Sequence, residues 1–138
     1  MSDWNDKVIE EFRTNKGHVG GGFAGAPLLL LHHCGRKSGK EYVAPMMYQA
    51  GPGDTVYVFA SKGGSPDNPQ WYSNAVVAGK AHVELGTQSF DVSVEELTGQ
   101  ERDNVYGRQA AAFPGFADYE QKTRGIRIIP VLALTRTA

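Results

Sequence analysis

Residues 28–74 decide the fold, because this stretch combines strand-like runs with three short segments of similar chemistry. These segments read Cys34-Gly35-Arg36-Lys37-Ser38-Gly39-Lys40, Ala60-Ser61-Lys62-Gly63-Gly64 and Asn68-Pro69-Gln70-Trp71-Tyr72-Ser73-Asn74. Each segment lies beside a run that is typical of a strand, and each has the composition of a backbone turn that holds an anion. Together the three segments predict a binding site for a polyanionic small molecule.

The charged and capping residues of these segments explain the expected preference for an anion. Arg36 carries a planar guanidinium that fits a phosphate or a carboxylate, and nearby lysines supply compact point charges: Lys37, Lys40 and Lys62. Asn68 followed by Pro69 predicts the N-cap and first residue of a helix, whose free N–H groups and dipole also favour an anion. Any one segment alone would read equally well as a solvated turn, so the prediction rests on all three.

The composition is that of an ordinary globular protein of 138 residues, with 41% hydrophobic and 21% charged residues. We expect one domain, residues 1–138, which is long enough to bury a core. A net charge of −1 argues against a general nucleic-acid binder, which needs a basic field over a whole face. The single cysteine, Cys34, excludes an internal disulfide. With no apolar run near the ~20 residues that span a bilayer and no signal-peptide pattern, we expect a cytoplasmic protein.

Residues 2–16 predict an amphipathic helix, because Trp4, Val8 and Phe12 recur on one side and charged residues fill the other. This helix either packs on its own domain or rests on a membrane surface or a partner, which would make the protein membrane-associated. Residues 17–25 are rich in glycine and predict a mobile loop, either a plain linker or a flap over a binding site.

From residue 28 onward the hydrophobic period changes to two, and turn residues separate short extended runs. The expected strands are residues 28–33, 42–50, 55–61, 82–85, 89–94 and 126–135. The later helices are expected at residues 69–79, after a capping box at Thr98-Gly99-Gln100-Glu101, and at residues 116–123. The helix after the capping box is expected to carry Val105, Tyr106, Gln109, Ala110 and Phe113 on one face. Tight turns between strands favour an α+β fold, in which a mostly antiparallel sheet or barrel has flanking helices.

Three adjacent residues, His32, His33 and Cys34, invite interpretation as a metal site. Alternation along a strand sends His32 and Cys34 to one face and His33 to the other, and no carboxylate or second histidine-rich segment completes a four-ligand pattern. We therefore expect no metal, and we expect Cys34 to be a small buried hydrophobe and not a catalytic thiol.

The chain resembles the deazaflavin-dependent nitroreductase family of actinobacteria from about residue 20 to the C-terminus. The residues that carry the resemblance are Gly35-Arg36-Lys37-Ser38-Gly39, Val43, Pro45, Ala60-Ser61-Lys62-Gly63-Gly64, Asn68-Pro69, Trp71-Tyr72, Asn74, Phe113-Pro114, Tyr119 and Arg127-Ile128-Ile129-Pro130-Val131. The resemblance implies a split β-barrel, related to barrels that bind flavin mononucleotide, and it implies the 5-deazaflavin coenzyme F-420. That coenzyme carries a phosphodiester and an oligoglutamate tail, which agrees with a polyanion site.

The resemblance also implies three groups of coenzyme-binding residues. The tail and phosphate would be held by Arg36, Lys37, Ser38 and Lys62. The coenzyme cleft would be lined by Tyr42, Val43, Ala44, Pro45, Met46, Met47, Phe59, Ala60 and Ser61. Further N–H groups would come from Gln70, Trp71, Tyr72, Ser73 and Asn74.

The implied reaction is hydride transfer from C5 of reduced F-420 to an electrophilic acceptor. The protein would position the acceptor and stabilise developing negative charge, for which Ser61 and Tyr119 are the catalytic candidates. The family often has Arg where this chain has Tyr42, so one anion contact is lost.

The implied substrate pocket contains Met47, Phe113, Phe116 and Tyr119. The characterised nitroreductase has tyrosines at the first three positions, whereas here only Tyr119 has a hydroxyl. Because water can protonate a quinone oxygen, we expect a quinone acceptor before a nitro compound.

Two other functions stay open at this point. A split barrel can use flavin mononucleotide, which many such barrels hold between two subunits, although the basic turn suits a longer polyanionic tail. The protein could instead bind or carry F-420 without catalysis, since the pocket lacks the tyrosines of the characterised nitroreductase. The expected partner is a small-molecule acceptor, while a homodimer and a peripheral membrane contact through the first helix stay open.

Overall fold

A computed structural model describes residues 3–15, 28–35, 39–61, 64 and 66–137, with the side chains of the first helix described from Lys7 onward. Four residues predicted to bind the coenzyme lie outside these ranges: Arg36, Lys37, Ser38 and Lys62. The glycine-rich segment 17–25 lies outside them too, so its linker and flap interpretations stay predictions.

In the described part of the chain, helices and strands follow one another in the predicted order. The helices are α1 (Asp3–Thr14), α2 (Gln70–Ala78), α3 (Gly99–Ala112) and α4 (Gly115–Thr123). The strands are β1 (Leu28–Cys34), β2 (Glu41–Ala50), β3 (Thr55–Phe59), β4 (Lys80–Leu85), β5 (Gln88–Leu97) and β6 (Val131–Arg136).

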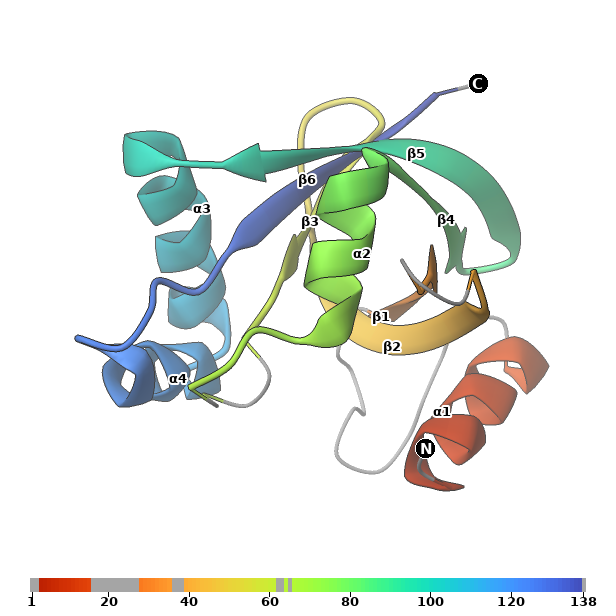
Figure 1. Cartoon of the computed structure of the whole chain (residues 1–138), viewed down its shortest axis with the longest axis horizontal. Helices are drawn as coiled ribbons and strands as arrows, with labels where there is room; N and C mark the ends of the chain where they lie inside the picture. Colours follow the sequence, from red (N-terminus) through yellow and green to blue (C-terminus); the bar gives the residue numbers. More distant parts are fainter. Residues whose placement is uncertain (1–2, 16–27, 36–38, 62–63, 65, 138) are drawn as a thin grey trace.

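The strands close into a barrel in the order β1-β2-β3-β6-β5-β4, and each neighbouring pair is antiparallel (Figure 1). Alternate residues point inward and form one apolar core: Leu29, Leu31, Val58, Val83, Val92, Leu132 and Leu134. Truncating one of these leucines to alanine costs about 2–5 kcal/mol in comparable cores, so the barrel is the stable frame of the molecule. The predicted α+β fold with a mostly antiparallel sheet is confirmed.

Helix α1 packs on the outside of the barrel, beside β1 and β2 (Figure 1). Val8 and Phe12 are buried against Leu28 and Leu30, so the predicted apolar stripe faces its own domain. Arg13 of this helix also forms an ion pair with Glu84 of β4 at 2.6 Å. Of the two interpretations of this helix, packing on its own domain is the one that the contacts support. No helix in the described residues is long and apolar enough to cross a membrane.

Helix α2 packs on β1, β4 and β5, and it adds Ala75 to the barrel core. Nδ2 of Asn74 lies 2.9 Å from Nδ1 of His33, so a buried polar pair joins α2 to β1. The helix ends at Gly79, whose φ of 71° is the left-handed conformation that favours glycine at this position. The predicted end of this helix is thereby confirmed.

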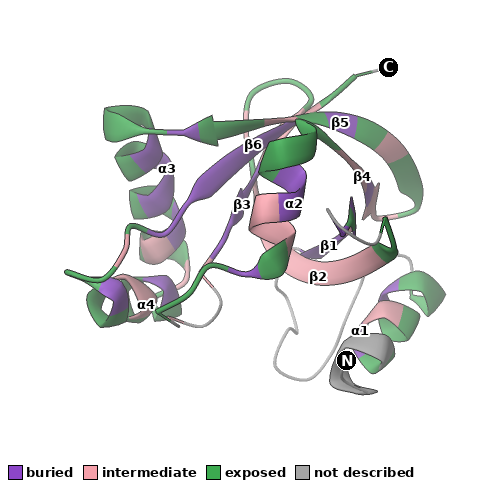
Figure 2. Cartoon of the chain, viewed as in Figure 1, coloured by how far each residue is buried: buried purple, intermediate pink, exposed green. Residues whose placement is uncertain are grey.

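Helices α3 and α4 cover a second core beside β3 and β6, where the inward faces are buried (Figure 2). The side of α3 that the sequence predicted to be apolar does face this core: Val105, Tyr106, Gln109, Ala110 and Phe113. The hydroxyl of Tyr106 donates to the carbonyl oxygen of Phe116 at 2.6 Å, which joins the two helices.

Three local predictions were wrong. The last strand begins at Val131 and not at residue 126, because Pro130 cannot donate to a ladder; Ile128 before it is 76% exposed. The N-cap of α2 is Pro69 and not Asn68, because the Asn68 side chain accepts from Arg127 instead. Thr98 does take the N-cap position of α3, but it forms no side-chain capping bond.

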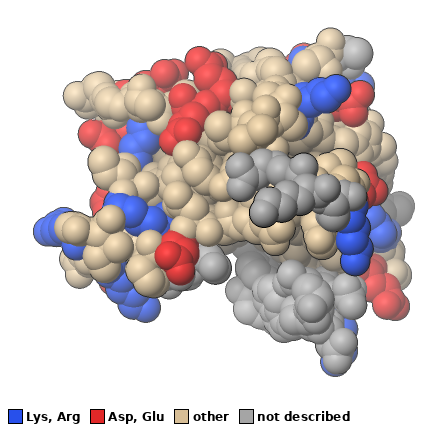
Figure 3. Space-filling model, in the orientation of Figure 1, with Lys and Arg blue, Asp and Glu red and all other residues tan. Residues whose placement is uncertain are grey.

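Charged side chains are distributed over the molecule without a dominant sign. On the face drawn in Figure 3, the basic side chains lie in separate groups with acidic groups between them. A general nucleic-acid binder concentrates basic charge over one face. The described charges form no such field on this face.

Candidate active site

The barrel has an unpaired edge where β2 and β3 part. The two strands pair only through Tyr48, Gln49 and Ala50 of β2. Further toward its start, β2 pairs with β1 alone among the described strands, so one edge of residues 41–47 offers backbone N–H and C=O groups to another partner. This edge contains most of the predicted cleft residues: Tyr42, Val43, Ala44, Pro45, Met46 and Met47. Pro45 suggested an edge or bulge position from the sequence, and it lies on an edge of this kind.

The segment that follows β3 is held in place by Arg127, which precedes β6. Nη1 of Arg127 donates to the carbonyl oxygen of Ala60 at 3.1 Å, and Nη2 donates to that of Ser61 at 2.9 Å. Nη1 also reaches Oδ1 of Asn68 at 2.7 Å, just before α2. Burial lowers the pKa of Arg127 from its ordinary value. One guanidinium therefore fixes both the Ser61 segment and the start of α2.

The N-terminus of α2 is suited to an anion. Pro69 is its N-cap and has no side chain that can cap, and no acidic residue lies in the first turn. The N–H of Tyr72 bonds to the carbonyl of Pro69, whereas helix geometry leaves the N–H groups of Gln70 and Trp71 without an intrahelical acceptor. These two N–H groups and the helix dipole favour negative charge.

The predicted substrate-pocket residues meet around one aromatic cluster. The Phe116 ring lies edge-to-face against Phe59 at 5.6 Å and against Tyr119 at 5.4 Å between ring centroids. Met47 and Phe113 pack against the same cluster. Phe116 is only 7% exposed and Phe59 only 6%, so these two buried rings support the wall of the site from the protein interior. Ala60 is fully buried beside them.

The other α2 residues that were predicted to bind the coenzyme direct their side chains to the rest of the protein. Trp71 packs against the barrel core, and Asn74 is committed to His33. The Tyr72 hydroxyl donates to Glu96 at 2.8 Å, and burial together with that bond raises the pKa of Tyr72 to about 12. These side chains position the helix, so what α2 offers a ligand is its backbone. Ser73 is half-buried on the same helix.

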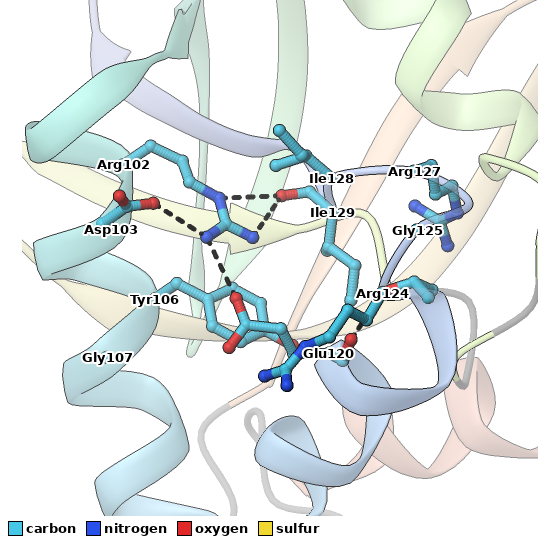
Figure 4. Close-up of a pocket in the computed structure, with 11 residues that line it drawn as sticks. Arg102, Asp103, Tyr106, Gly107, Glu120, Arg124, Gly125, Arg127, Ile128 and Ile129 are labelled. Carbon is cyan, nitrogen blue, oxygen red and sulfur yellow. Dashed lines mark hydrogen bonds and ion pairs between the residues drawn. The ribbon is translucent and has the colours of Figure 1, made fainter.

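A cavity of about 480 Å³ lies between α3, α4 and the segment before β6, away from the unpaired edge (Figure 4). Its central group is Arg102, which donates to the carbonyl of Ile129 at 2.9 and 3.1 Å and to Asp103 and Glu120 at 3.1 and 3.2 Å. The guanidinium also lies over the Tyr106 ring, 4.5 Å from its centroid. Because these partners satisfy the buried charge, we assign Arg102 a structural role.

A second cavity, of about 380 Å³, brings together the residues that suggested a metal. His32 lies 2.7 Å from Glu84 and 3.3 Å from Glu41, so the fold supplies carboxylates that the local sequence lacked. Each of these histidine nitrogens thus has a carboxylate partner. Among the described residues, no group of three or more histidine, cysteine, aspartate or glutamate side chains is arranged to hold a metal ion. Cys34 is exposed and not buried as predicted, because it ends β1 at the barrel rim.

Sequence reasoning missed several residues that shape the site. Arg127 was noted only as part of a closing motif, and nothing local indicates that it reaches Ser61, 66 residues away. Arg102 was not singled out from the sequence, and nothing local indicates that it reaches the carbonyl of Ile129. Gln109 was expected only on the packed side of its helix, and nothing local indicates that Gln49 reaches it, 60 residues away.

The chain matches, over residues 4–136, the protein family described as F-420H(2)-dependent quinone reductase. The protein belongs to this family. A putative F-420H(2)-dependent quinone reductase of Mycobacterium tuberculosis is 36% identical over 113 residues, which cover 80% of this chain and 94% of the relative. A solved F-420-H2-dependent reductase is 35% identical with a TM-score of 0.69 and covers 78% of this chain and 93% of its own. A solved domain-swapped dimer is 34% identical with a TM-score of 0.70, and the match covers 96% and 97% of the two chains.

As a member of the F-420H(2)-dependent quinone reductase family, the protein is an oxidoreductase whose coenzyme is reduced F-420 and whose acceptors are quinones. The split-barrel fold and the coenzyme implied by the resemblance are confirmed. The family favours F-420 over flavin mononucleotide and an enzyme over a carrier. The residues present fit the coenzyme: an unpaired strand edge can bond a flat heterocycle, and the uncapped start of α2 can receive a phosphate.

Proposed function

We propose that this quinone reductase binds the deazaflavin ring along the unpaired edge of β2, between Tyr42 and Met47. The parting of β2 from β3 after the Tyr48–Val58 pair carries the proposal, because it leaves a row of backbone donors and acceptors for the ring. The phosphate would lie near the N–H groups of Gln70 and Trp71. The tail would be held by the predicted basic residues Arg36, Lys37 and Lys62, together with the hydroxyl of Ser38.

The bound reduced coenzyme supplies a hydride from C5. The protein's own residues bind, orient and exclude water: Met47, Phe113 and Phe116 present apolar groups beside the β2 edge. Ser61, held through its carbonyl by Arg127, keeps its hydroxyl available to bond an oxygen that gains negative charge. Tyr119, half-buried against Phe116, is the second polar group of the pocket.

A quinone suits this pocket better than a nitro compound does. The quinone gains a hydride and, from water, a proton, which together give a hydroquinone. This chemistry needs no protonated side chain in the pocket. Met47, Phe113 and Phe116 cannot donate a proton, which agrees with an acceptor that water can protonate.

A homodimer of this chain is a further proposal, supported by the solved relative that is a domain-swapped dimer. Light scattering coupled to gel filtration of the purified protein, with and without F-420, measures the molecular mass directly. A mass of one chain under both conditions would reject the dimer.

Amide hydrogen exchange followed by NMR tests the proposed coenzyme position. Oxidised F-420 should slow exchange at those of residues 42–47 whose N–H groups point to the unpaired edge, Pro45 having none, and at Gln70 and Trp71, because those N–H groups gain a ligand. The hairpin of β4 and β5 provides an internal control, since it lies on another part of the barrel. Protection that arises elsewhere, with residues 42–47 unchanged, would reject this position. Flavin mononucleotide tested in parallel shows whether the response is specific to the deazaflavin.

A further inference from the structure

A third cavity, of about 420 Å³, lies between β2 and α3 and adjoins the aromatic cluster. Its volume falls within the roughly 300–1,000 Å³ of typical small-molecule sites. The wall includes Tyr48, Gln49, Arg108, Gln109, Ala112 and Phe113. Phe113 packs against the same cluster as Met47, so this cavity lies next to the candidate site.

A directed chain of hydrogen bonds runs along one wall of this cavity. Nε of Arg108 donates to Oε1 of Gln49 at 3.3 Å, which fixes the orientation of the Gln49 amide. Nε2 of Gln49 then donates to the carbonyl of Val105 at 3.2 Å and to Oε1 of Gln109 at 3.3 Å. The Gln109 amide is therefore oriented with its oxygen toward Gln49 and its nitrogen away from it.

The chain ends on a donor that the protein does not use. Gln109 is only 2% exposed, and its Nε2 is the one buried side-chain nitrogen or oxygen in the described residues that has no hydrogen-bond partner. A buried donor without an acceptor is costly and rare in folded proteins, so it calls for a specific explanation. A ligand oxygen that accepts from Nε2 would provide one.

We propose that this cavity is the quinone site, and that a quinone oxygen accepts a hydrogen bond from Nε2 of Gln109. The proposal rests on the quinone reductase function and adds to it the place of the acceptor. The flat apolar ring fits beside Phe113 and Ala112, while Arg108 and Gln109, which also line the cavity, both carry N–H donors.

These donors match the charge that the acceptor gains. The quinone takes a hydride, which brings two electrons, and then a proton from water, and it leaves as the hydroquinone while the coenzyme is oxidised. Negative charge develops on a quinone oxygen before that proton arrives, and an amide N–H stabilises it without giving up its own proton. Gln109 is thus a substrate-binding donor and not a general acid.

Direct binding can be observed at the Gln109 amide itself. In ¹⁵N-labelled protein, the Gln109 side-chain NH₂ pair is assigned as the pair missing from Gln109→Leu. The probe is 2,3-dimethyl-1,4-naphthoquinone, whose blocked ring positions prevent addition to the exposed thiol of Cys34. Saturable shifts of that pair are expected, whereas an unchanged pair at quinone concentrations that saturate turnover would overturn the proposal.

A matched pair of variants tests the cavity without relying on a buried substitution. Ala112 and Ala111 are both exposed near the end of α3, but only Ala112 lines the cavity. Ala112→Trp should raise the quinone KM at least tenfold and leave F-420 affinity unchanged, whereas Ala111→Trp should behave as wild type. Equal kinetics in the two variants would overturn the proposal.

Gln109→Leu provides the kinetic test of the donor, with Gln100→Leu on an exposed part of α3 as its control. We expect Gln109→Leu to lower quinone kcat/KM about tenfold at unchanged F-420 affinity and with no fall in melting temperature, since it also removes the unpaired donor. Wild-type kinetics in Gln109→Leu would overturn the proposal and leave quinone reduction intact. If the wild type reduced no quinone, the proposed quinone reductase function would be rejected. The amide titration would still decide whether the cavity binds the quinone ring.

Discussion

Nη2 of Arg127 donates to the carbonyl oxygen of Ser61 at 2.9 Å and so joins the segment before β6 to the end of β3. Because Nη1 of the same guanidinium reaches Ala60 and Asn68, the Ser61 segment and the start of α2 keep a fixed relation to one another. Both belong to the proposed coenzyme site, so Arg127 should matter for binding without touching the coenzyme.

Arg127→Met should weaken F-420 binding about tenfold and lower the free energy of unfolding by about 1–3 kcal/mol, because three bonds from a charged donor are lost. The variant keeps most of the apolar stem. Arg124→Met, on an exposed arginine three residues earlier, is the control. Fluorescence titration and thermal melts measure the two effects. If both variants bound F-420 as the wild type does, Arg127 would have no positioning role.

Arg36→Ala and Lys62→Ala should each weaken F-420 binding by about 1–3 kcal/mol, through loss of charge-assisted bonds to the coenzyme's anionic groups. The salt dependence of binding should decrease in parallel, since fewer charges are paired. Lys80→Ala, at the exposed start of β4, is the control. Unchanged F-420 affinity in both Arg36→Ala and Lys62→Ala would show that these residues do not bind the anionic groups of the coenzyme.

Acid should destabilise the protein through His33. Burial lowers the pKa of His33, with a smaller contribution from His32. Because the folded-state pKa lies below the unfolded value of about 6.5, the neutral ring is favoured on folding. That stability is fully present above about pH 6.5 and is lost as the pH falls through the lowered folded-state value.

The free energy of unfolding in urea should therefore decrease between about pH 7 and pH 5, and the decrease should be shallower in His33→Gln, which has no ring to protonate. An NMR titration of the His33 ring gives the folded-state value independently. Identical pH slopes in wild type and variant would show that another group causes the acid sensitivity.

Phe116→Tyr tests whether a missing hydroxyl limits nitro reduction. The added oxygen would lie in a cluster with Phe59 and Tyr119, and burial of a hydroxyl without a partner would cost about 1–3 kcal/mol of stability. Turnover of a nitroimidazole should increase while quinone turnover stays close to wild type. Phe113→Tyr introduces the second missing hydroxyl at a less buried position. Lack of any gain in both variants would refute this explanation of acceptor preference.

The sequence was sufficient where local periodicity determines structure. The Val8 and Phe12 stripe gave the packed side of α1, and the spacing of Val105, Tyr106 and Gln109 gave the buried side of α3. Alternation in the strands and tight turns between them gave the antiparallel barrel. These features depend on neighbours within a few residues along the chain.

The sequence was insufficient where the site depends on barrel closure. His32 meets Glu84 across 52 positions of sequence, and Gln49 meets Gln109 across 60. No local pattern indicates such pairs, because they arise only when β1 joins β4 or when α3 packs over β2. The wrong start of β6 has a local cause: Ile126 and Ile128 continue the alternating pattern, but Pro130 prevents the strand from extending to them.

The most direct measurement is an anaerobic reaction of the purified enzyme with reduced F-420 and 2,3-dimethyl-1,4-naphthoquinone, in which both products are quantified. One hydroquinone should form for each F-420 oxidised, and reduced flavin mononucleotide at the same concentration should give no comparable turnover. Binding of F-420 without hydroquinone formation from this or any other quinone tested would contradict the quinone reductase function.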